Sequence, residues 1–592
     1  MKKQDLLPVV IIFALILAYP EIDRRLVRKI FPGKPVPTRV TEQAPDRSTP
    51  EDAAFAATED TTPSPTAATQ PTTEAPQAAP VAAMPEEPAP PPVVTVLENE
   101  LLRLSLTSHG AGIASATITG YPISQGTDEC VTYDFSDRPA ATPTGYSGLP
   151  PAAAFEVVAA TSNSVTYRKT LHTGLTLQRT LTLGAHYQIK IAEQLTNTSD
   201  ATLATHGQGI QAGFMHNLPG ESQLRQGPTL GVDTLTGSAG VRYWGAKLDK
   251  WFPPNGNRAS QTIPGPNAEP DPVDWVAVKN KYFTQILTPD VPAKQCATTA
   301  EHGPAVHSSF LGLFPKTTIP IARVAAGLTY PGVDINPGQT ITRNTTFYIG
   351  PKVYNLLKAN GPHQEDVLQL GFWRPIGIGI LKIMVWFHDH VWPYNYGLAI
   401  ILLTFLIRAI FWPLNHKSMV STRQMQAIQP LITAAREKYK DNPQRQQQEM
   451  MALYKEHKIN PMGGCLPMLI QIPVFFALFV VLRGAIELRF SSFLWIRDLS
   501  TPENLLRDVL PFPINILPIF MGVTMWLQQR MTPTADPQQQ RMMMLMPILF
   551  TFMFYSFPSG LSLYWSINQV LMIIQLAWMK KRHPTPAPAP AK

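Results

Sequence analysis

The chain has 592 residues, enough for several domains, and 44% of them are hydrophobic. Only 15% are charged, below the ~25% that is usual in soluble domains, and the formal net charge of +7 is small for this length. Without a long block of Lys or Arg, this composition argues against a protein that binds nucleic acid directly. The three cysteines, Cys130, Cys296 and Cys465, exclude a disulfide-dense scaffold and a multi-cysteine zinc site.

The chain begins with a short apolar segment, LLPVVIIFALILAY at residues 6–19, preceded by two lysines. The segment is shorter than the ~20 residues of a membrane-spanning helix, so a signal peptide is an alternative. No small-x-small cleavage pattern follows, which favours an uncleaved signal-anchor helix at residues 1–20. Four cations just after the segment argue weakly against an N-terminus in the cytoplasm.

Residues 21–92 are predicted to be a disordered linker. Between residues 35 and 92 there are fourteen prolines and one aromatic residue, Phe55, but no Ile or Leu. Such a segment buries too little apolar surface to offset the entropy that ordering would cost, and its prolines keep it extended.

Residues 93–355 alternate apolar and polar side chains and are rich in Thr, Val and Tyr, as in SVTYRKTLHT, TLQRTLTLG and TITRNTTFYIG. This period of two is typical of half-buried strands, and its length predicts a large all-β sandwich. Cys130 and Cys296 both lie in this region, and the sequence leaves open whether they form a disulfide.

Residues 356–396 connect the strand-rich region to the C-terminal part and are predicted to lie at a membrane interface. His388-Asp389-His390 invites a metal-site interpretation, but two histidines spaced by two residues point to different faces of a helix. The neighbouring Trp386 and Trp392 favour an interfacial position instead.

From residue 397 onward, five apolar runs predict a core of five membrane-spanning helices, which with the N-terminal helix makes six. Each run approaches or reaches the spanning length, and a backbone in lipid must satisfy its own hydrogen bonds as a helix. Pro518 is expected to kink the shortest run. The runs occupy residues 397–414, 465–482, 514–527, 542–558 and 560–579.

The charges of the loops predict the orientation. Residues 415–460 carry eight Lys or Arg against four acids, and the tail after residue 580 carries basic residues with no acid. The positive-inside rule therefore places 415–460, 529–541 and the tail in the cytoplasm. The strand-rich region and the charge-balanced loop 483–513 fall on the opposite side, and both termini are cytoplasmic.

Residues 415–460 are predicted to form a helical hairpin around the turn Asp441-Asn442-Pro443. Apolar residues recur at helical spacing on both sides of the turn, namely Met425, Ile428, Ile432 and Ala435, then Met450, Met451, Leu453 and Tyr454. The hairpin is either a solvated connector or a docking surface for apolar segments.

Arg408 is the main candidate site residue, because it lies inside the 397–414 run with Thr404 one turn before it. An arginine in lipid costs ~2.5–3.5 kcal/mol, so it normally faces water or a partner. None of the five runs contains an Asp or Glu that would pair with it. Snorkelling toward the headgroups is the alternative.

Other polar residues in the same runs either join the helices by hydrogen bonds or, together with Arg408, line one hydrated and positively charged groove. Gln471 and Thr524 interrupt the second and third runs, and Ser566, Asn568, Gln569 and Gln575 lie in the last.

Enzymatic motifs are absent from the sequence. It contains no G-x-x-x-x-G-K-[ST], H-E-x-x-H or G-x-S-x-G pattern, so no cofactor, nucleotide or metal is expected. Two specific functions stay open at this point. One is a transporter for a small polar solute, and the other is a membrane-anchored sugar enzyme that uses the strand-rich region.

Several segments resemble the YidC/Oxa/Alb family of membrane protein insertases in order and spacing, over essentially the whole chain except the linker. In the helical part these are LTFLIRAIFWPL (403–414), NPMGGCLPMLIQIPVFFALF (460–479), LPIFMGVTMWLQQRMTP (517–533) and FPSGLSLYWSINQVLMIIQ (557–575). WVAVKNKYFTQILTP (275–289) and FYIGPKVYNLLK (347–358) resemble the family's large periplasmic domain.

The resemblance implies a fold and a site. It implies a signal anchor, a periplasmic β-supersandwich over residues 93–355, a five-helix insertase core over 397–580 with a cytoplasmic hairpin at 415–460, and a cytoplasmic tail at 581–592. Arg408 matches the arginine of a hydrophilic groove that opens to cytoplasm and lipid. Its implied lining is Thr404, Gln471, Trp565, Asn568, Gln569 and Gln575, with Trp565 where relatives often have Tyr.

The resemblance also implies a function, an insertase and folding chaperone of the bacterial inner membrane that works without a cofactor. Its implied partners are nascent membrane proteins, the lipid bilayer and Sec translocon components. Ribosome binding stays open, because the tail PTPAPAPAK is short and barely basic.

Overall fold

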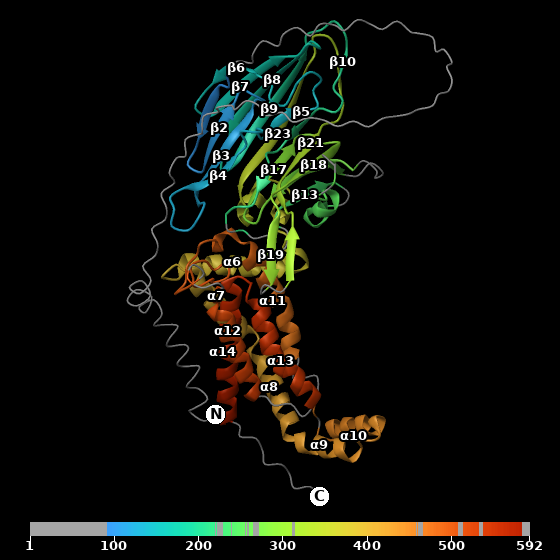
Figure 1. Cartoon of the computed structure of the whole chain (residues 1–592), viewed down its shortest axis with the longest axis vertical. Coiled ribbons are helices and arrows are strands. Elements are labelled where there is room, and N and C mark those ends of the chain that lie inside the picture. The colour runs from blue at the N-terminus through green and yellow to red at the C-terminus, as the bar shows by residue number, and fades with distance from the viewer. Residues whose placement is uncertain are drawn as a thin grey trace, which may run out of the picture. The chain divides into compact units, whose positions relative to one another are not determined.

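The computed structural model describes residues 91–582 except for 220, 222–228, 238–239, 255, 257–259, 264–270, 311–313, 458, 460–465, 507–508, 510–512 and 532–536 (Figure 1). The described residues belong to one compact unit. The predicted anchor at 1–20, nearly all of the linker, Cys465 and the last ten residues lie outside them.

The first half of the described chain, here called the β domain (residues 94–351), is all-β as predicted, and its strands are antiparallel. Its largest sheet has the order β14-β13-β16-β17-β23-β9-β8-β7-β6. The bounds are β6 Glu156–Ala160, β7 Ser164–Thr170, β8 Leu175–Leu183, β9 Gln188–Asn197, β13 Gly231–Thr236, β14 Gly240–Tyr243, β16 Val273–Lys279, β17 Phe283–Pro289 and β23 Thr340–Pro351.

Smaller sheets complete the β domain. One has the order β1-β2-β3-β4 and another the order β15-β18-β21-β11-β5, with β12 beside β21. Two pairs, β10 with β22 and β19 with β20, stand apart. The bounds are β1 Val94–Glu98, β2 Leu102–Thr107, β3 Gly112–Pro122, β4 Cys130–Asp134, β5 Thr142–Thr144, β10 Leu203–Ala204, β11 Gly209–Gln211, β12 Met215–His216, β15 Gln261–Ile263, β18 Gln295–His302, β19 Val306–Phe310, β20 Phe314–Thr318, β21 Ile321–Thr329 and β22 Asp334–Ile335.

The alternation in the sequence explains these strands directly. In β8, LTLQRTLTL, every leucine is buried, whereas the threonines between them are half-buried on the other face. Across the strands the threonines pair through their hydroxyls, as in Thr166 with Thr180 (2.9 Å). Period-two sequences of this kind have one buried and one solvated face.

A buried ion pair joins the sheets in the interior. Arg179 on β8 donates from Nε to Glu193 on β9 (2.8 Å), and both side chains are fully buried. Its other nitrogens donate to the carbonyls of Ala111 (2.5 Å) and Ala141 (2.6 Å). The guanidinium therefore fixes two segments outside its own sheet.

The question of a disulfide in the β domain is answered by the structure. Cys130 on β4 is half-buried, Cys296 on β18 is buried, and both thiols are free.

The second half of the described chain is helical, and α7 and α11 to α14 run side by side (Figure 1). Here α14 contacts α7, α11 and α12, while α6 lies against α7 and α11. The bounds are α5 Tyr354–Asn360, η3 Gln364–Leu368, η4 Gly371–Trp373, α6 Arg374–His390, α7 Tyr396–Ile410, α8 Trp412–Ala427, α9 Gln429–Lys438, α10 Pro443–Glu456, α11 Leu466–Gly484, η6 Ile486–Leu488, α12 Ile516–Met531, α13 Pro537–Phe554 and α14 Ser559–Arg582. Within the β domain, η2 (Gly245–Lys247) and α4 (Leu248–Trp251) follow β14.

Two details differ from the sequence predictions, and both follow from proline chemistry. The 397–414 run is not one helix, because α7 ends at Ile410 and α8 starts at Trp412 with a bend of 65°. Pro413 lies in the first turn of α8, where its missing N–H leaves no hydrogen bond unmade. Pro518 was predicted to kink α12, which is wrong: it lies in the first turn, a position that proline tolerates.

Among the described residues, one helix alone is long and apolar enough to cross a membrane, α14 over Ser559–Met579, or two if α7 and α8 form one bent span. The apolar parts of α11 and α13 are shorter, at Gln471–Gly484 and Met543–Phe554. The number of spans therefore stays a prediction.

Candidate functional site

Arg408 lies in the last turn of α7, and its side chain is directed toward α14. Its Nη2 donates to the main-chain carbonyl of Asn568 (2.7 Å) and contacts Sδ of Met572 (3.4 Å). Within the described part of the chain, its Nε is buried and has no hydrogen-bond partner. The guanidinium thus faces a neighbouring helix, and its contacts differ from those of an arginine that snorkels outward.

Three of the predicted lining residues, Thr404, Gln471 and Asn568, use their polar groups in different ways. Thr404 is fully buried, but its hydroxyl donates to the Ile400 carbonyl of its own helix (2.7 Å), so its donor is already used. The Nε2 atom of Gln471 on α11 donates to the hydroxyl of Tyr564 on α14. Asn568 contributes through its backbone, since its carbonyl is the group that accepts from Arg408.

Trp565, Gln569 and Gln575 lie along α14 near Asn568, within about a third of its circumference at 3.6 residues per turn. Gln569 and Gln575 are buried. The Trp565 ring packs edge-on against Phe475 of α11 (5.2 Å between centroids) and also contacts Phe554 of α13 (5.7 Å). Its side chain therefore joins three helices.

Several buried polar atoms on α14 lack a partner within the described residues: Ser562 Oγ, Trp565 Nε1, Ser566 Oγ and Gln575 Nε2. Buried polar groups normally find hydrogen-bond partners. At about 100° per residue, Trp565 and Gln575 lie within about 60° of Asn568 on α14, whereas Ser562 and Ser566 point to other faces of the helix. Only the first two therefore share the side of α14 that Arg408 contacts.

Sequence reasoning missed two contributors, Tyr564 and Met572. Tyr564 supplies a hydroxyl one position before Trp565, so the tryptophan does not leave this region without a phenolic group. A signal was available, because residues 564, 568 and 572 follow each other at i, i+4 and therefore share a face of α14.

At one end of these helices lies the loop of residues 485–515, here called the 485–515 loop. Asn395, which caps α7, donates to the Ser492 carbonyl (2.8 Å). The first amides of α14 donate to the same loop, Ser559 to Thr501 (2.8 Å) and Gly560 to Leu499 (2.9 Å). The loop thus closes over the starts of α7 and α14.

Glu503 in this loop holds the start of α12. Its carboxylate accepts from the backbone N–H of Leu517 (2.9 Å) and from Trp495 Nε1 (2.7 Å). Burial raises the pKa of the Glu503 carboxyl to about 7, although these hydrogen bonds favour the charged form. Four non-glycine residues of the loop have positive φ, namely Phe490, Leu494, Asn504 and Leu506. This backbone is therefore held in a costly conformation by its surroundings.

At the opposite ends, α8 and the hairpin meet the core. Arg423 of α8 donates to the carbonyl of Met579 near the end of α14 (2.7 Å). Residues 415–460 form the end of α8, then α9 and α10, with Asn442 capping α10, so the first of the two predicted helices is divided at Ile428, just before Pro430. Ile428, Ile432 and Ile459 form the small core of the hairpin, against which Met425, Met450, Leu453 and Tyr454 pack, whereas Met451 is exposed.

The His388-Asp389-His390 sequence ends α6 and forms local contacts. His388 Nδ1 lies 2.8 Å from Asp389 and its ring stacks on Tyr396, while His390 stacks on Trp386. In the described ranges, no group of three or more His, Cys, Asp or Glu could hold a metal ion.

Comparison with known proteins adds sequence relationships. The family described as "60Kd inner membrane protein" matches residues 386–586, and the "YidC periplasmic domain" matches residues 94–386. A membrane protein insertase YidC of Geotalea daltonii is 34% identical over 434 residues, 71% of this chain and 72% of that one. Its counterpart in Pelobacter propionicus is 48% identical over 255 residues, 42% of this chain and 47% of that one.

The chain spans about half the length of several of these relatives. A solved structure titled "Active YidC insertase crystal structure with the first transmembrane domain resolved" is 18% identical and covers 83% of this chain and 95% of its own, with a TM-score of 0.33.

Proposed function

The chain belongs to the YidC family of membrane protein insertases, and from that premise we propose that it inserts hydrophobic segments of nascent proteins into the bacterial inner membrane. The observation that carries the proposal is the position of Arg408, which is turned toward α14, donates to the Asn568 carbonyl and has a buried Nε that lacks a partner in the described residues. Such a site offers hydrogen bonds and positive charge to a polar segment on its way across lipid.

The mechanism follows from this chemistry. The apolar part of a nascent segment stays in contact with lipid, while its polar or acidic flank is held by Arg408 and by the unused polar groups of α14. Burial of ~20 apolar residues in the bilayer then drives release, so no nucleotide is needed. The 485–515 loop, which closes over the starts of α7 and α14, keeps the path closed at that end.

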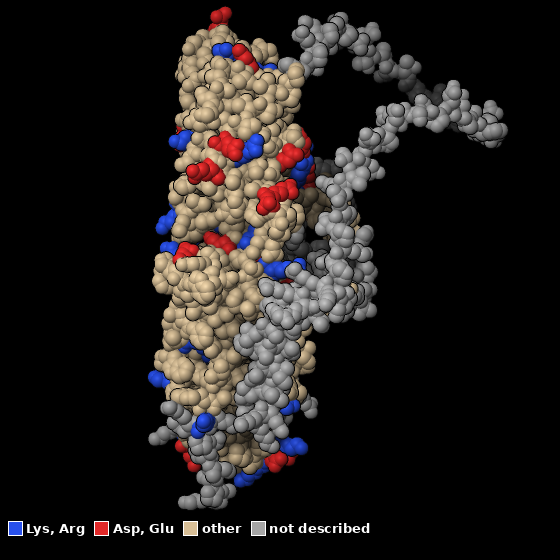
Figure 2. All heavy atoms as spheres, turned by 90° about the vertical axis from the view of Figure 1, so that its left-hand side faces the viewer, with Lys and Arg blue, Asp and Glu red and all other residues tan. Residues whose placement is uncertain are grey.

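The surface of the helices supports a position in lipid. Large apolar side chains are exposed on α13, among them Ile548 (69%) and Leu545 (66%), and on α7 at Ile410 (61%). On the face shown in Figure 2, the surface over the helices carries few charged side chains between its two ends. Exposed apolar patches of this extent need a lipid or protein partner.

The contacts of the β domain support its predicted side of the membrane. It touches the 485–515 loop, for example through Gln125 Nε2 and the Arg497 carbonyl (2.7 Å). Both therefore lie on one side, which the loop charges assign to the periplasm, and the α9–α10 hairpin lies in the cytoplasm. The partly exposed methionines of the hairpin suit it to receive varied apolar segments.

Partners other than nascent chains and lipid belong to the same proposal. A role as folding chaperone and association with Sec translocon components fit an exposed apolar surface, and ribosome binding would use the cations of residues 415–460, which outnumber the acids there by eight to four. The alternative of a transporter for small polar solutes is disfavoured by the relatives, which are named insertases.

The charge of Arg408 gives the test. Arg408→Ala should slow the insertion of substrates with acidic translocated tails about tenfold or more, because a hydrogen bond to a charged group contributes ~1.5–3 kcal/mol. Arg408→Lys should retain most of the activity. Insertion is measured in proteoliposomes by protease protection of the translocated tail.

The matched control is Arg530→Ala, which removes an exposed arginine from the last turn of α12, where it covers Trp526. This variant should insert all substrates normally. Normal insertion of several acidic-tailed substrates by Arg408→Ala would refute the charge role.

A further inference from the structure

The turn between β16 and β17 is buried, which is unusual for a connection between strands. Asn280 is fully inaccessible, and Lys281 and Tyr282 are nearly so. The turn is rigid, since Asn280 Oδ1 accepts from the backbone N–H groups of Tyr282 (3.1 Å) and Phe283 (2.8 Å). Asn280 also donates to the Tyr133 hydroxyl (2.8 Å), which fixes the turn to the rest of the β domain.

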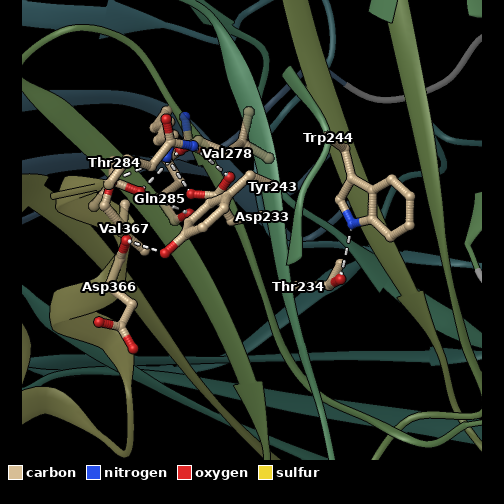
Figure 3. Close-up of polar contacts among 11 residues, drawn as sticks. Asp233, Thr234, Tyr243, Trp244, Val278, Thr284, Gln285, Asp366 and Val367 are labelled. Atoms are coloured by element: carbon tan, nitrogen blue, oxygen red, sulfur yellow. Dashed lines mark hydrogen bonds and ion pairs between the residues drawn. The ribbon is translucent and has the colours of Figure 1, made fainter. Parts of the chain in front are cut away.

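One end of this turn holds the segment that leads to α6. Lys279 pairs with Asp233 and donates to the Val367 carbonyl (2.9 Å), while Gln369 donates to the same aspartate (3.1 Å). Figure 3 shows Tyr243 beside Asp233, with its hydroxyl directed at the backbone of Asp366 (3.2 Å). The turn and η3 therefore form one anchored unit.

The tip of the turn reaches the 485–515 loop. Lys281 Nζ donates to the Ser500 carbonyl (3.2 Å), and the Tyr282 hydroxyl lies 2.8 Å from Ser500 Oγ. Because Ser500 Oγ donates to Asp498 (2.6 Å), its remaining bond is one in which Tyr282 donates. Ser500 is fully buried, so none of these bonds is replaced by water at low cost.

A second contact fixes the same loop nearby. The Arg489 guanidinium lies over the rings of Tyr282 (5.4 Å) and Phe283 (5.7 Å), and its Nη2 donates to the Ile123 carbonyl (3.1 Å). Arginine over aromatic rings is a favourable arrangement, more so when desolvated. Two segments of the β domain thus hold the loop between them.

The segment Leu499-Ser500-Thr501 connects these contacts to the insertase helices. Ser500 bonds the β domain, while the carbonyls on either side of it, Leu499 and Thr501, accept the first amides of α14. Those amides, Gly560 and Ser559, have no partner inside their own helix. A displacement of Ser500 therefore moves the acceptors that cap α14, the helix whose Asn568 holds Arg408.

We propose that Lys281 and Tyr282 are positioning residues for insertion: through Ser500 they hold the capping segment of α14, so that the β domain braces the helix that faces Arg408. The role concerns an interaction within the chain and goes beyond the proposed site. The part of this proposal that concerns insertion rests on the proposed function, whereas the contact between the β domain and α14 does not.

The structural test uses the full chain in lipid nanodiscs and amide hydrogen exchange. Tyr282→Phe and Lys281→Met should each speed exchange of the peptide covering residues 557–565 about tenfold, because a buried donor or acceptor loses its partner. Tyr330→Phe and Lys169→Met are matched controls elsewhere in the β domain, because they remove a buried hydroxyl bonded to Thr345 (2.7 Å) and an ammonium bonded to the Ala154 carbonyl (2.7 Å), and they should leave that peptide unchanged. Equal exchange in test and control variants would overturn the proposal.

A reciprocal change keeps the test decisive if one variant folds poorly. Ser500→Ala should have at least the effect of Tyr282→Phe, because it also removes the bond to Asp498. Adding Tyr282→Phe to Ser500→Ala should then have little further effect, since their shared contact is already lost. Fully additive effects would show that the two residues act separately and would overturn the proposal.

The functional arm separates positioning from general stability. Tyr282→Phe and Lys281→Met should slow insertion severalfold at an unchanged melting temperature. Lys281→Arg, which keeps the positive charge, should insert at the rate of the unmodified chain. Unchanged insertion, or loss only in parallel with melting, would overturn the positioning role. If the unmodified chain inserts nothing, the proposed function fails, whereas the exchange measurement still decides on the brace.

Discussion

At the scale of single residues, the chain places its costliest groups where helices or sheets must be held together. Arg408 joins α7 to α14, and Glu503 joins the 485–515 loop to α12. Arg179 and Glu193 perform the same task between sheets. In each case, hydrogen bonds to backbone groups compensate for the cost of removing a charged group from water.

The raised pKa of Glu503 predicts a dependence of stability on pH. The pKa lies at about 7 in the folded chain and near 4.5 when unfolded, so the folded state binds this proton more tightly. Its contribution is therefore complete below pH 4.5 and is lost as pH rises through 7, by ~3 kcal/mol at most. Hydrogen exchange of the first turn of α12, measured from pH 5 to 8 with correction for intrinsic rates, reports this loss.

Glu503→Gln should remove that dependence, because the amide is neutral throughout and still accepts a hydrogen bond. Glu503→Ala should instead loosen α12 at every pH, by ~1 kcal/mol, as loss of a capping group does. A pH profile of Glu503→Gln identical to that of the unmodified chain would contradict the assignment.

The buried pair of Arg179 and Glu193 predicts an asymmetric response to mutation. Glu193→Ala should destabilise the β domain by ~3–5 kcal/mol, because it leaves a guanidinium buried and unpaired. The double change to Met at both positions should recover much of this loss. Denaturant unfolding followed by exchange of β8 amides provides the measurement.

An exposed pair in the same sheet serves as the control. Glu156 and Arg168 lie 3.3 Å apart with side chains 65% and 44% exposed. Glu156→Ala should therefore cost less than ~1 kcal/mol. A similar cost at both positions would show that burial does not govern these pairs.

At the scale of elements, the sequence predicts periodic structure well and its interruptions poorly. The leucine and threonine alternation of β8 and the apolar spacing around Asn442 each determine one element, and both elements are present. The break after Ile410 was missed because Trp412-Pro413-Leu414 continue the apolar run. Composition shows whether a segment is apolar, whereas its direction depends on neighbouring helices.

The small core of the α9–α10 hairpin predicts that it is easily unfolded. Ile432→Asp places a charge among Ile428, Ile459 and their neighbours and should open the hairpin. Limited trypsin digestion should then cut at Lys438 and Lys440 at least several times faster, while α14 stays protected. The control variant Ala434→Asp changes an exposed position of α9, and trypsin should cleave it at the normal rate.

At the scale of the whole molecule, the predicted orientation rests on loop charges and on the contact between the β domain and the 485–515 loop. Single cysteines in a cysteine-free chain test it. A membrane-impermeant maleimide should label exposed positions Lys294→Cys and Arg497→Cys from the periplasmic side of intact cells, because both lie on one side of the membrane. Lys440→Cys in the hairpin should react only after the membrane is opened, and the reverse pattern would contradict the orientation.

The long-range contacts mark the limit of prediction from one sequence. Arg408 was found because an arginine in an apolar run is costly wherever it lies. The bond from Lys281 to Ser500 joins residues more than two hundred positions apart, and neither residue is unusual in its own segment. Pairing of this kind depends on the folded arrangement of strands, so no local pattern indicates it.

The unpaired thiols of the β domain have a consequence for how the protein is made. Burial raises the pKa of the Cys296 thiol to about 12, so at neutral pH almost none of it is the reactive thiolate. Burial therefore protects this thiol from oxidation, and the β domain folds without a bond between Cys130 and Cys296. Refolding yields with and without dithiothreitol should be equal.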